Sequence, residues 1–470
     1  MTRFEVVFVS TPAMGHIVST VEFANYITKN HPEISTTILI ITMPHTSLVN
    51  TYTQSRASTD TNLRFIYLPT VDPPTPDQYQ SLNGFLSLLI QNHKNNIKNA
   101  LLDIMITEST SESVKLAALF IDLFSTTIID VAEELSVPCY LLFASPASFL
   151  GFMLHLPQVE SIESDTEFEI PSFKNKLPRL VLPNLALNWK TEDGYSWFSY
   201  HGRRYRETKG IIVNTLQELE PHALQSLHND LQLPPVYSIG PIVDHVGPVQ
   251  WDPNPAQYDY IMKWLDMQPL ASVVFLCFGS MGSLEAKQVE QIAIGLERVG
   301  VRFLWALREP PKTRLEGPRN YTSHEDVLPV GFLKRTAEMG IVCGWVPQVK
   351  VLAHKAVGGF VSHCGWNSIL ESLWYGVPIA TWPIYAEQQM NAFQMVKELG
   401  LAVEIRMDYR RGGDLVVQAE EVENGISTLM NGSDEIRRKV KDMSEKCRVA
   451  LMENGSSYTN LLSFIHQLTK

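Results

Sequence analysis

The segment 345–388 limits the possible folds more than any other part of the chain, because its pattern alternates between strand and helix. Val357–Ser362 is a short apolar run rich in Val and Phe, which is typical of a buried parallel strand. The run ends at His363-Cys364-Gly365, and a helical pattern begins at about Trp366. This order predicts a doubly wound α/β domain, in which ligands bind at the carboxyl ends of the strands.

The polar residues of this turn indicate an anion site. Asn367 and Ser368 stand near the predicted helix N-terminus, where free N–H groups and the helix dipole favour negative charge. Together with His363 they are typical of a diphosphate cradle. Two simpler interpretations stay open: His363 is a strand-end histidine, and Ser368 with Glu371 forms a capping box.

The same order of strand, turn and helix occurs twice more. Phe4–Ser10 leads through a glycine turn to a helix that starts at His16, and Val273–Phe278 leads through Gly279-Ser280-Met281-Gly282-Ser283 to a helix over 285–299. The second turn can donate to a phosphate or be purely structural. At 470 residues the chain is long enough for two such domains in tandem.

Asp122 ends an apolar run and is followed by Leu123. A carboxylate there is costly unless it is paired. Because Ser125 is placed to cap the next helix, Asp122 is free either to bind its own loop amides in an Asx-turn or to pair with His16. His16 itself is either a solvent-facing helix-cap residue or one half of that pair.

The pattern predicts further elements. Strands are expected at 35–42, 63–68, 116–121, 138–143, 211–214 and 402–405, helices at 79–107 and 126–135, and a long surface loop at 309–329. Trp189, Trp197, Phe198 and Tyr200 belong either to the core or to a pocket.

Composition excludes several classes of protein. A net charge of -12 argues against a nucleic-acid surface, and no run approaches 18 apolar residues, so no membrane span is expected. A strand begins directly at Phe4, which leaves no room for a signal peptide. The five cysteines show no metal spacing and are odd in number, so we expect reduced thiols and a cytoplasmic protein.

The assembled segment 345–388 resembles the signature box of the plant family 1 UDP-glycosyltransferases. It contains Trp-x-Pro-Gln, then His-Cys-Gly-Trp-Asn-Ser-x-x-Glu, then Gly-Val-Pro, and it ends in Glu-Gln. The resemblance implies an α/β fold of GT-B type, with two Rossmann-like domains facing across a cleft. It assigns 1–241 to the acceptor, 242–258 to a linker and 259–455 to the UDP-sugar, with a last helix at about 456–470 that packs back on the first domain.

The resemblance also assigns site residues. His16 becomes the catalytic base and Asp122 the residue that orients it. Trp345 is predicted to stack on the uracil, Gln348 to lie near the base and the ribose, and Glu371 to accept from the ribose hydroxyls. The predicted contacts of the phosphates are Ser280, His363, Asn367 and Ser368, and those of the sugar are Trp366, Glu387 and Gln388, while Tyr385 is expected at the seam with the acceptor. Three further residues predicted to bind the donor are Gly15, Val346 and Gly365.

The implied reaction is an inverting transfer of a sugar from a UDP-sugar to a hydroxyl of a small lipophilic acceptor. Gln388 favours UDP-glucose as the donor, and no metal is expected because no Asp-x-Asp stands beside the cradle. We expect a monomer with no bound cofactor, no nucleic-acid partner and no membrane span. Two alternatives remain at this point: a sugar-nucleotide epimerase, and a UDP-sugar-binding protein without catalysis. The acceptor class is open among flavonoids, other phenolics, terpenoids and hormones.

Overall fold

The computed structural model describes residues 3–43, 47–59, 63–109, 114–159, 167–245, 255–312, 316–432 and 434–469. Contacts divide the chain into two compact units. Unit 1 comprises Met1–Lys174, Leu185–Val243 and Val449–Lys470, and unit 2 comprises Asn175–Asn184 and Asp244–Arg448. Residues 246–254, the middle of the predicted linker 242–258, lie outside the described residues.

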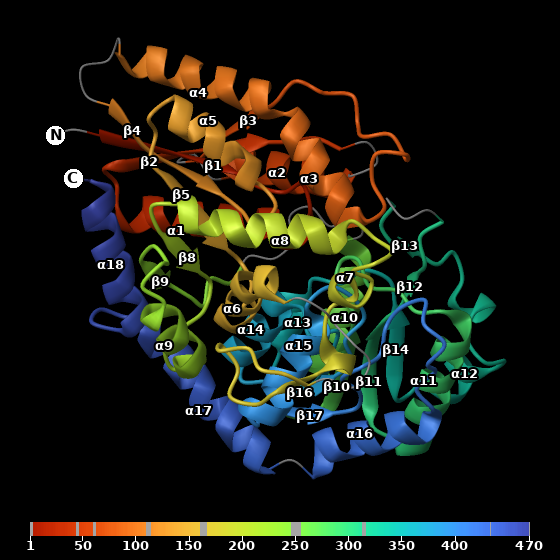
Figure 1. The fold of residues 1–470 in the computed structure, drawn as a ribbon. Coiled ribbons are helices and arrows are strands. Elements are labelled where there is room, and N and C mark those ends of the chain that lie inside the picture. Colours follow the sequence, from red (N-terminus) through yellow and green to blue (C-terminus); the bar gives the residue numbers. More distant parts are fainter. Residues whose placement is uncertain are drawn as a thin grey trace. The chain divides into compact units, whose positions relative to one another are not determined.

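Unit 1 is built on a seven-stranded parallel sheet in the order β3-β2-β1-β4-β5-β8-β9 (Figure 1). Its strands are β1 (Arg3–Val9), β2 (Ile34–Ile40), β3 (Leu63–Tyr67), β4 (Val114–Ile121), β5 (Cys139–Phe143), β8 (Ile211–Val213) and β9 (Val236–Ser238). Its helices are α1 (Met14–Asn30), α2 (Ser47–Thr59), α3 (Leu82–Asn92), α4 (Lys94–Ser109), α5 (Ile129–Glu134), α6 (Ala147–His155), α8 (Gly194–Arg204), α9 (Pro221–Asn229) and α18 (Ser456–Leu468).

Aromatic side chains fill the core of unit 1. Phe8 of β1 stacks on Phe120 of β4 with ring centroids 4.6 Å apart, and Phe23 of α1 meets both rings edge-on. Phe464 of α18 packs against Phe120 and Tyr140, so the last helix contributes to this core. Burial of large aromatic rings on a sheet of this kind is a main source of its stability.

Unit 2 is built on a six-stranded parallel sheet in the order β14-β11-β10-β15-β16-β17. Its strands are β10 (Val273–Cys277), β11 (Arg302–Ala306), β14 (Gly340–Cys343), β15 (Val357–Ser362), β16 (Ile379–Thr381) and β17 (Ala402–Glu404). Its helices are α10 (Pro255–Asp266), α11 (Ala286–Val299), α12 (Phe332–Arg335), α13 (Gln348–Leu352), α14 (Trp366–Tyr375), α15 (Gln388–Phe393) and α16 (Ala419–Asn431). Two further helices, α7 (Asn184–Leu187) and α17 (Asp434–Leu451), carry the chain from one unit to the other.

Two expected elements differ from the structure. The helix expected over 79–107 is two helices, because the chain breaks at His93 between α3 and α4. The loop expected over 309–329 contains part of a small antiparallel ribbon, in which β12 (Arg308–Glu309) pairs with β13 (Arg319–Asn320). Two-residue strands give no alternating pattern, so the sequence carries no strand signal there.

Candidate active site

His16 lies in the first turn of α1, and its side chain is 23% exposed. Its Nδ1 is 3.3 Å from Oδ2 of Asp122, the residue that follows β4. β1 and β4 are neighbouring parallel strands in which Val9 lies opposite Ile121, so both side chains leave the sheet at the same edge. The structure therefore brings together the two residues predicted to form a pair.

Asp122 is 4% exposed and accepts hydrogen bonds at both carboxylate oxygens. Oδ2 accepts from the Thr11 N–H at 2.6 Å, while Oδ1 accepts from the Phe124 N–H at 3.1 Å and the Ser125 hydroxyl at 2.7 Å. Burial by itself raises the pKa of Asp122, but the interactions with His16, Thr11 and Ser125 outweigh it and hold that pKa below its ordinary value. Asp122 is therefore a charged carboxylate at neutral pH.

Ser125 does not act as the expected helix cap. It occupies the N-cap position of a short 3₁₀ turn, Thr126–Ile128, but its side chain forms no capping hydrogen bond. Its hydroxyl donates to Asp122 instead. A buried carboxylate is the stronger acceptor, because hydrogen bonds to an ionised group are shorter and stronger than neutral ones. Asp122 thus both binds its loop amides and pairs with His16.

An aromatic ring lies beside His16 and packs against a second aromatic ring. The Phe124 ring lies 5.5 Å from the His16 ring and 5.6 Å from that of Phe198, which is buried in α8. Gly15, directly before His16, leaves open space, since a Cβ placed there would meet nothing within 4 Å. A polar nitrogen beside apolar rings suits a hydrophobic molecule that carries a hydroxyl.

His201 is a polar residue of this region that the sequence reasoning missed. It is fully buried in α8, with Nε2 2.9 Å from the Ser87 hydroxyl and Nδ1 2.6 Å from the Thr126 hydroxyl. Burial lowers its pKa to about 3, against the opposing effect of Asp122, so the ring is neutral. Its neighbours in sequence are aromatic and basic, and no motif singles it out.

In unit 2, the glycine turn after β10 meets the turn after β15. His363 is 6% exposed, and a Cβ at Gly279 or at Gly365 would lie 2.5 Å from its Nε2. Gly279 also has a φ of +77°, which favours glycine. Burial lowers the pKa of His363 to about 4, and its Nδ1 has no hydrogen-bond partner among the described residues. Ser280 lies one residue further along the same turn.

Helix α14 starts directly behind His363. Gly365 is its N-cap residue and supplies no side-chain cap, so Trp366, Asn367 and Ser368 occupy the first three helical positions. The preceding residue, Cys364, takes a left-handed φ of +61°. The capping-box interpretation of Ser368 and Glu371 is therefore wrong, because the cap position belongs to Gly365.

Ser368 and Glu371 instead share a partner. Gln348 Nε2 donates to the Ser368 hydroxyl at 2.7 Å and to Glu371 Oε2 at 2.6 Å. Burial raises the pKa of Glu371 to about 8, which the Gln348 hydrogen bond opposes and nearby Asp244 reinforces. The structure thus joins three of the predicted donor residues on α13 and α14.

Trp345 and Val346 precede this group. The Trp345 backbone N–H donates to Asn320 Oδ1 at 3.0 Å, and its side chain is half-buried. Val346 is 3% exposed. Asn320, on β13, is a second residue that the sequence reasoning missed, because it lies in the segment expected to be a surface loop.

The loop before α15 carries Tyr385, Glu387 and Gln388. Gln388 is 3% exposed, and its Oε1 accepts from the backbone N–H of Ile384 at 2.9 Å and of Tyr385 at 3.0 Å. Glu387 is the N-cap residue of α15 without a side-chain cap bond. Gln388 therefore shapes the loop with its carbonyl oxygen, and the amide group remains as the hydrogen-bond donor of this side chain.

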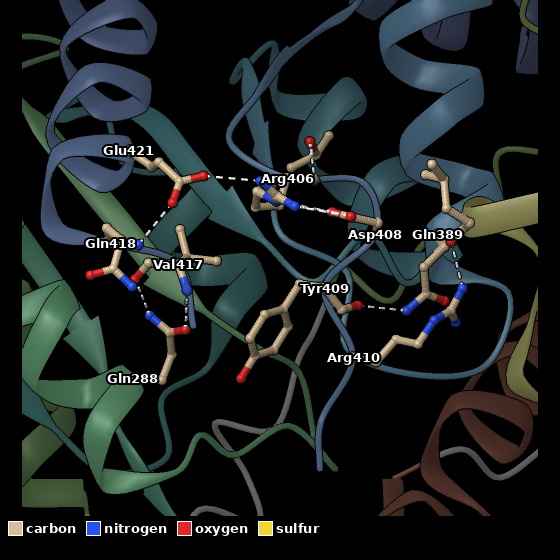
Figure 2. A network of polar contacts seen from close by, with 11 residues as sticks. Gln288, Gln389, Arg406, Asp408, Tyr409, Arg410, Val417, Gln418 and Glu421 are labelled. Atoms are coloured by element: carbon tan, nitrogen blue, oxygen red, sulfur yellow. Dashed lines mark hydrogen bonds and ion pairs between the residues drawn. The ribbon is translucent and has the colours of Figure 1, made fainter. Parts of the chain in front are cut away.

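A network of polar contacts links α15, which follows this loop, to the segment after β17 (Figure 2). Gln389 Nε2 donates to the Tyr409 carbonyl at 2.8 Å, and Arg410 Nη2 donates to the Leu182 carbonyl at 2.7 Å. Earlier in the same segment, Arg406 is paired with two carboxylates. The start of α15 is therefore fixed to the segment that follows β17.

Within the described residues, no three or more His, Cys, Asp or Glu side chains are grouped so that they could hold a metal ion. No helix in the described part of the chain is long and apolar enough to cross a membrane.

Comparisons with known proteins show the family of this chain. The family model of UDP-glucuronosyl and UDP-glucosyl transferases matches residues 95–433. UDP-glycosyltransferase 43 of Pueraria montana var. lobata is 68% identical over 100% of both chains, and UDP-glucose flavonoid 3-O-glucosyltransferase 6 of Fragaria ananassa is 46% identical over 99% of this chain and 98% of its own. A crystal structure of a Medicago truncatula glycosyltransferase complexed with UDP-glucose is 39% identical, with a TM-score of 0.90 over 100% of this chain and 99% of that one.

These similarities extend over the whole chain and include both parallel sheets, which match the GT-B architecture of the solved plant enzymes. They identify a transferase, which rules out the epimerase and the binding-protein alternatives. The chain therefore belongs to the plant family 1 UDP-glycosyltransferases, and it is a UDP-glycosyltransferase.

Proposed function

We propose that this enzyme transfers glucose from UDP-glucose to a hydroxyl of a small lipophilic acceptor, with inversion at the anomeric carbon. The observation that carries the proposal is the His16–Asp122 pair. Nδ1 of His16 faces a carboxylate, so Nδ1 holds the proton and Nε2 is left as the basic nitrogen. Nε2 takes the acceptor's hydroxyl proton as the oxygen attacks the anomeric carbon.

Asp122 stabilises the imidazolium that this proton transfer creates. The arrangement of base and orienting carboxylate matches that of a serine hydrolase triad, with the acceptor hydroxyl in place of the serine. The bond between the anomeric carbon and the diphosphate oxygen breaks as the new carbon–oxygen bond forms. UDP leaves, and the proton stays on His16 until the product departs.

The unit 2 residues are proposed to hold the donor. Trp345 stacks on the uracil, Gln348 lies near the base and the ribose, and Glu371 accepts hydrogen bonds from the ribose hydroxyls. The backbone N–H groups in the first turn of α14, together with His363 and Ser368, stabilise the negative charge that develops on the leaving diphosphate. The loop with Glu387 and Gln388 contacts the glucose hydroxyls.

For the acceptor, we propose a flavonoid or a related phenolic. The relative from Fragaria ananassa is a flavonoid 3-O-glucosyltransferase, and the Phe124 ring beside His16, packed against Phe198, suits a flat aromatic molecule. We place the reaction in the cytosol, in line with five buried cysteines that carry no disulfide.

The test is the release of UDP from UDP-glucose in the presence and absence of flavonoid, simple phenolic and terpenoid acceptors. We expect release that depends on a flavonoid or phenolic acceptor and yields a β-glucoside. Release with terpenoids alone would contradict the acceptor class, and an α-glucoside would contradict the single-displacement mechanism.

A further inference from the structure

We propose that Arg308 and Asn320, facing residues of the β12–β13 ribbon, are positioning residues that hold the Trp345 indole in place for the nucleotide base. The inference rests on the proposed function, in which Trp345 stacks on the uracil. Arg308 of β12 lies directly opposite Asn320 of β13. Each of the two residues contacts Trp345, so both contacts come from one point of the ribbon.

The first contact fixes the backbone. The Trp345 N–H donates to Asn320 Oδ1 at 3.0 Å. Gly344, the residue before it, makes room for this side chain, since a Cβ at Gly344 would lie 2.5 Å from Cγ of Asn320. The ribbon therefore fixes the backbone at Trp345, and with it the point from which the indole side chain extends.

The second contact fixes the ring. Cζ of Arg308 lies 5.3 Å from the centroid of the Trp345 ring, within the range of a cation–π interaction. Arg308 is only 8% exposed. A desolvated cation gains more from an aromatic face than an exposed one does, so burial strengthens this contact.

Arg308 has few other partners among the described residues, so the indole face is a main contact of its positive charge. Nη2 donates to the Pro318 carbonyl, whereas Nε and Nη1 have no hydrogen-bond partner among the described residues. The structure gives it no ion pair with a described carboxylate. Burial lowers the pKa of Arg308, as expected for a cation without a carboxylate partner. A buried arginine of this kind costs free energy, which a purely structural role does not explain.

The consequence is a preorganised stacking surface. With one face of the indole against Arg308 and its backbone held by Asn320, the ring loses little freedom when a base stacks on it. The ribbon therefore acts on affinity for the nucleotide, and it should leave the chemical step unchanged.

The experiment is a double-mutant cycle on the full-length enzyme, with UDP affinity measured by calorimetry. Arg308→Met should weaken UDP binding about 3- to 30-fold, the effect of a cation–π contact of ordinary strength. It should raise KM for UDP-glucose by a similar factor and change kcat by less than about twofold. Arg308→Lys, which keeps the cation, should lose less. In a Trp345→Ala background, Arg308→Met should cause no further loss.

A matched control lies on the same ribbon. Arg319 is exposed and pairs with Glu316, so Arg319→Met should leave UDP affinity unchanged. The inference would be overturned if Arg308→Met weakened UDP binding by the same factor in the unmodified enzyme and in the Trp345→Ala background. If Arg308→Met does not fold, Asn320→Ala provides the second variant, and unchanged UDP affinity in that variant and in Arg308→Lys would overturn it too. If Trp345→Ala itself keeps full UDP affinity, the proposed base site fails, which is a separate result.

Discussion

At the scale of single residues, the chemistry depends on which atoms of each polar side chain already form hydrogen bonds or ion pairs within the protein. His16 offers Nε2 because Nδ1 faces Asp122, and Asp122 can orient the ring because its other lone pairs are filled by backbone and hydroxyl donors. A carboxylate is the one group of this shape that accepts at every position. Four donors therefore surround position 122, and an aspartate can accept from all of them.

Asp122→Asn tests this point, because an amide cannot accept at all four positions. One orientation turns the NH₂ group toward Thr11 and His16, and the other turns it toward Phe124 and Ser125. We expect kcat to fall about 10²- to 10⁴-fold, the usual contribution of a general base, with little change in UDP-glucose affinity. Steady-state kinetics and calorimetry measure both quantities. Ser125→Ala, which keeps the charge, should lose far less, and equal losses would contradict the assignment.

Glu371 predicts a pH dependence of donor binding. Its pKa of about 8 means that the carboxyl is largely protonated below that pH in the free enzyme. Ribose hydroxyls that donate to it favour the carboxylate, so they lower its pKa on binding and release a proton. UDP-glucose affinity should therefore rise with pH between about 6 and 8 and level off above.

The measurement is calorimetry of UDP-glucose binding in buffers of different ionisation enthalpy, which counts the protons released. Glu371→Gln cannot titrate and should show no proton release from this position. Affinity that falls as pH rises from 6 to 8 in the unmodified enzyme would contradict the proposed role of Glu371.

At the scale of elements, one arrangement serves both units: a parallel strand, a tight turn and a helix that starts at the edge of the sheet. In unit 1 this arrangement positions His16, and in unit 2 it appears twice, after β10 and after β15. The two turns of unit 2 meet at His363, where two glycines lie against the imidazole. Glycine is required there by space, and at Gly279 also by its φ.

Gly279→Ala tests the close approach. The new Cβ would lie 2.5 Å from His363 Nε2, so the ring must move, and we expect UDP-glucose affinity to fall about tenfold or more. Gly300→Ala is the control, because Gly300 has a similar φ of +65° but nothing within 4 Å of a new Cβ. Both variants should lose about 1–2 kcal/mol of stability from backbone strain. Only Gly279→Ala should lose affinity, and a similar loss in both would contradict the interpretation.

Some of these elements could be predicted from the sequence and others could not. Apolar strands such as β15 and β10 could be located because buried parallel strands read as continuous hydrophobic runs. The pairing of His16 with Asp122 followed from two polar residues at neighbouring strand ends, together with the family resemblance. The β12–β13 ribbon could not be found, since two-residue strands carry no period. Arg308 did carry a signal of the kind used for Asp122, a charge at the end of an apolar run, but nothing in the sequence names its partner.

At the scale of the whole molecule, the two units have different proposed roles. The proposed base lies in unit 1, and nearly all proposed donor contacts lie in unit 2. A ligand that binds only the folded state stabilises it by an amount set by its concentration relative to Kd, about 2.7 kcal/mol at a hundredfold excess. UDP should therefore stabilise the two units unequally.

Hydrogen exchange measures this difference. We expect UDP to slow exchange most in the turns before α11, α14 and α15, and to slow it less in the sheet of unit 1. UDP should also raise the melting temperature. Protection confined to unit 1 would contradict the assignment of donor residues.

The proposed mechanism is tested most directly by the turnover of His16→Ala with UDP-glucose and an acceptor whose hydroxyl is weakly acidic. We expect transfer to fall by about 10²- to 10⁴-fold, because no other group takes the proton, while calorimetry shows the same affinity for UDP-glucose as in the unmodified enzyme. Turnover that remains unchanged in His16→Ala would show that His16 is not the general base.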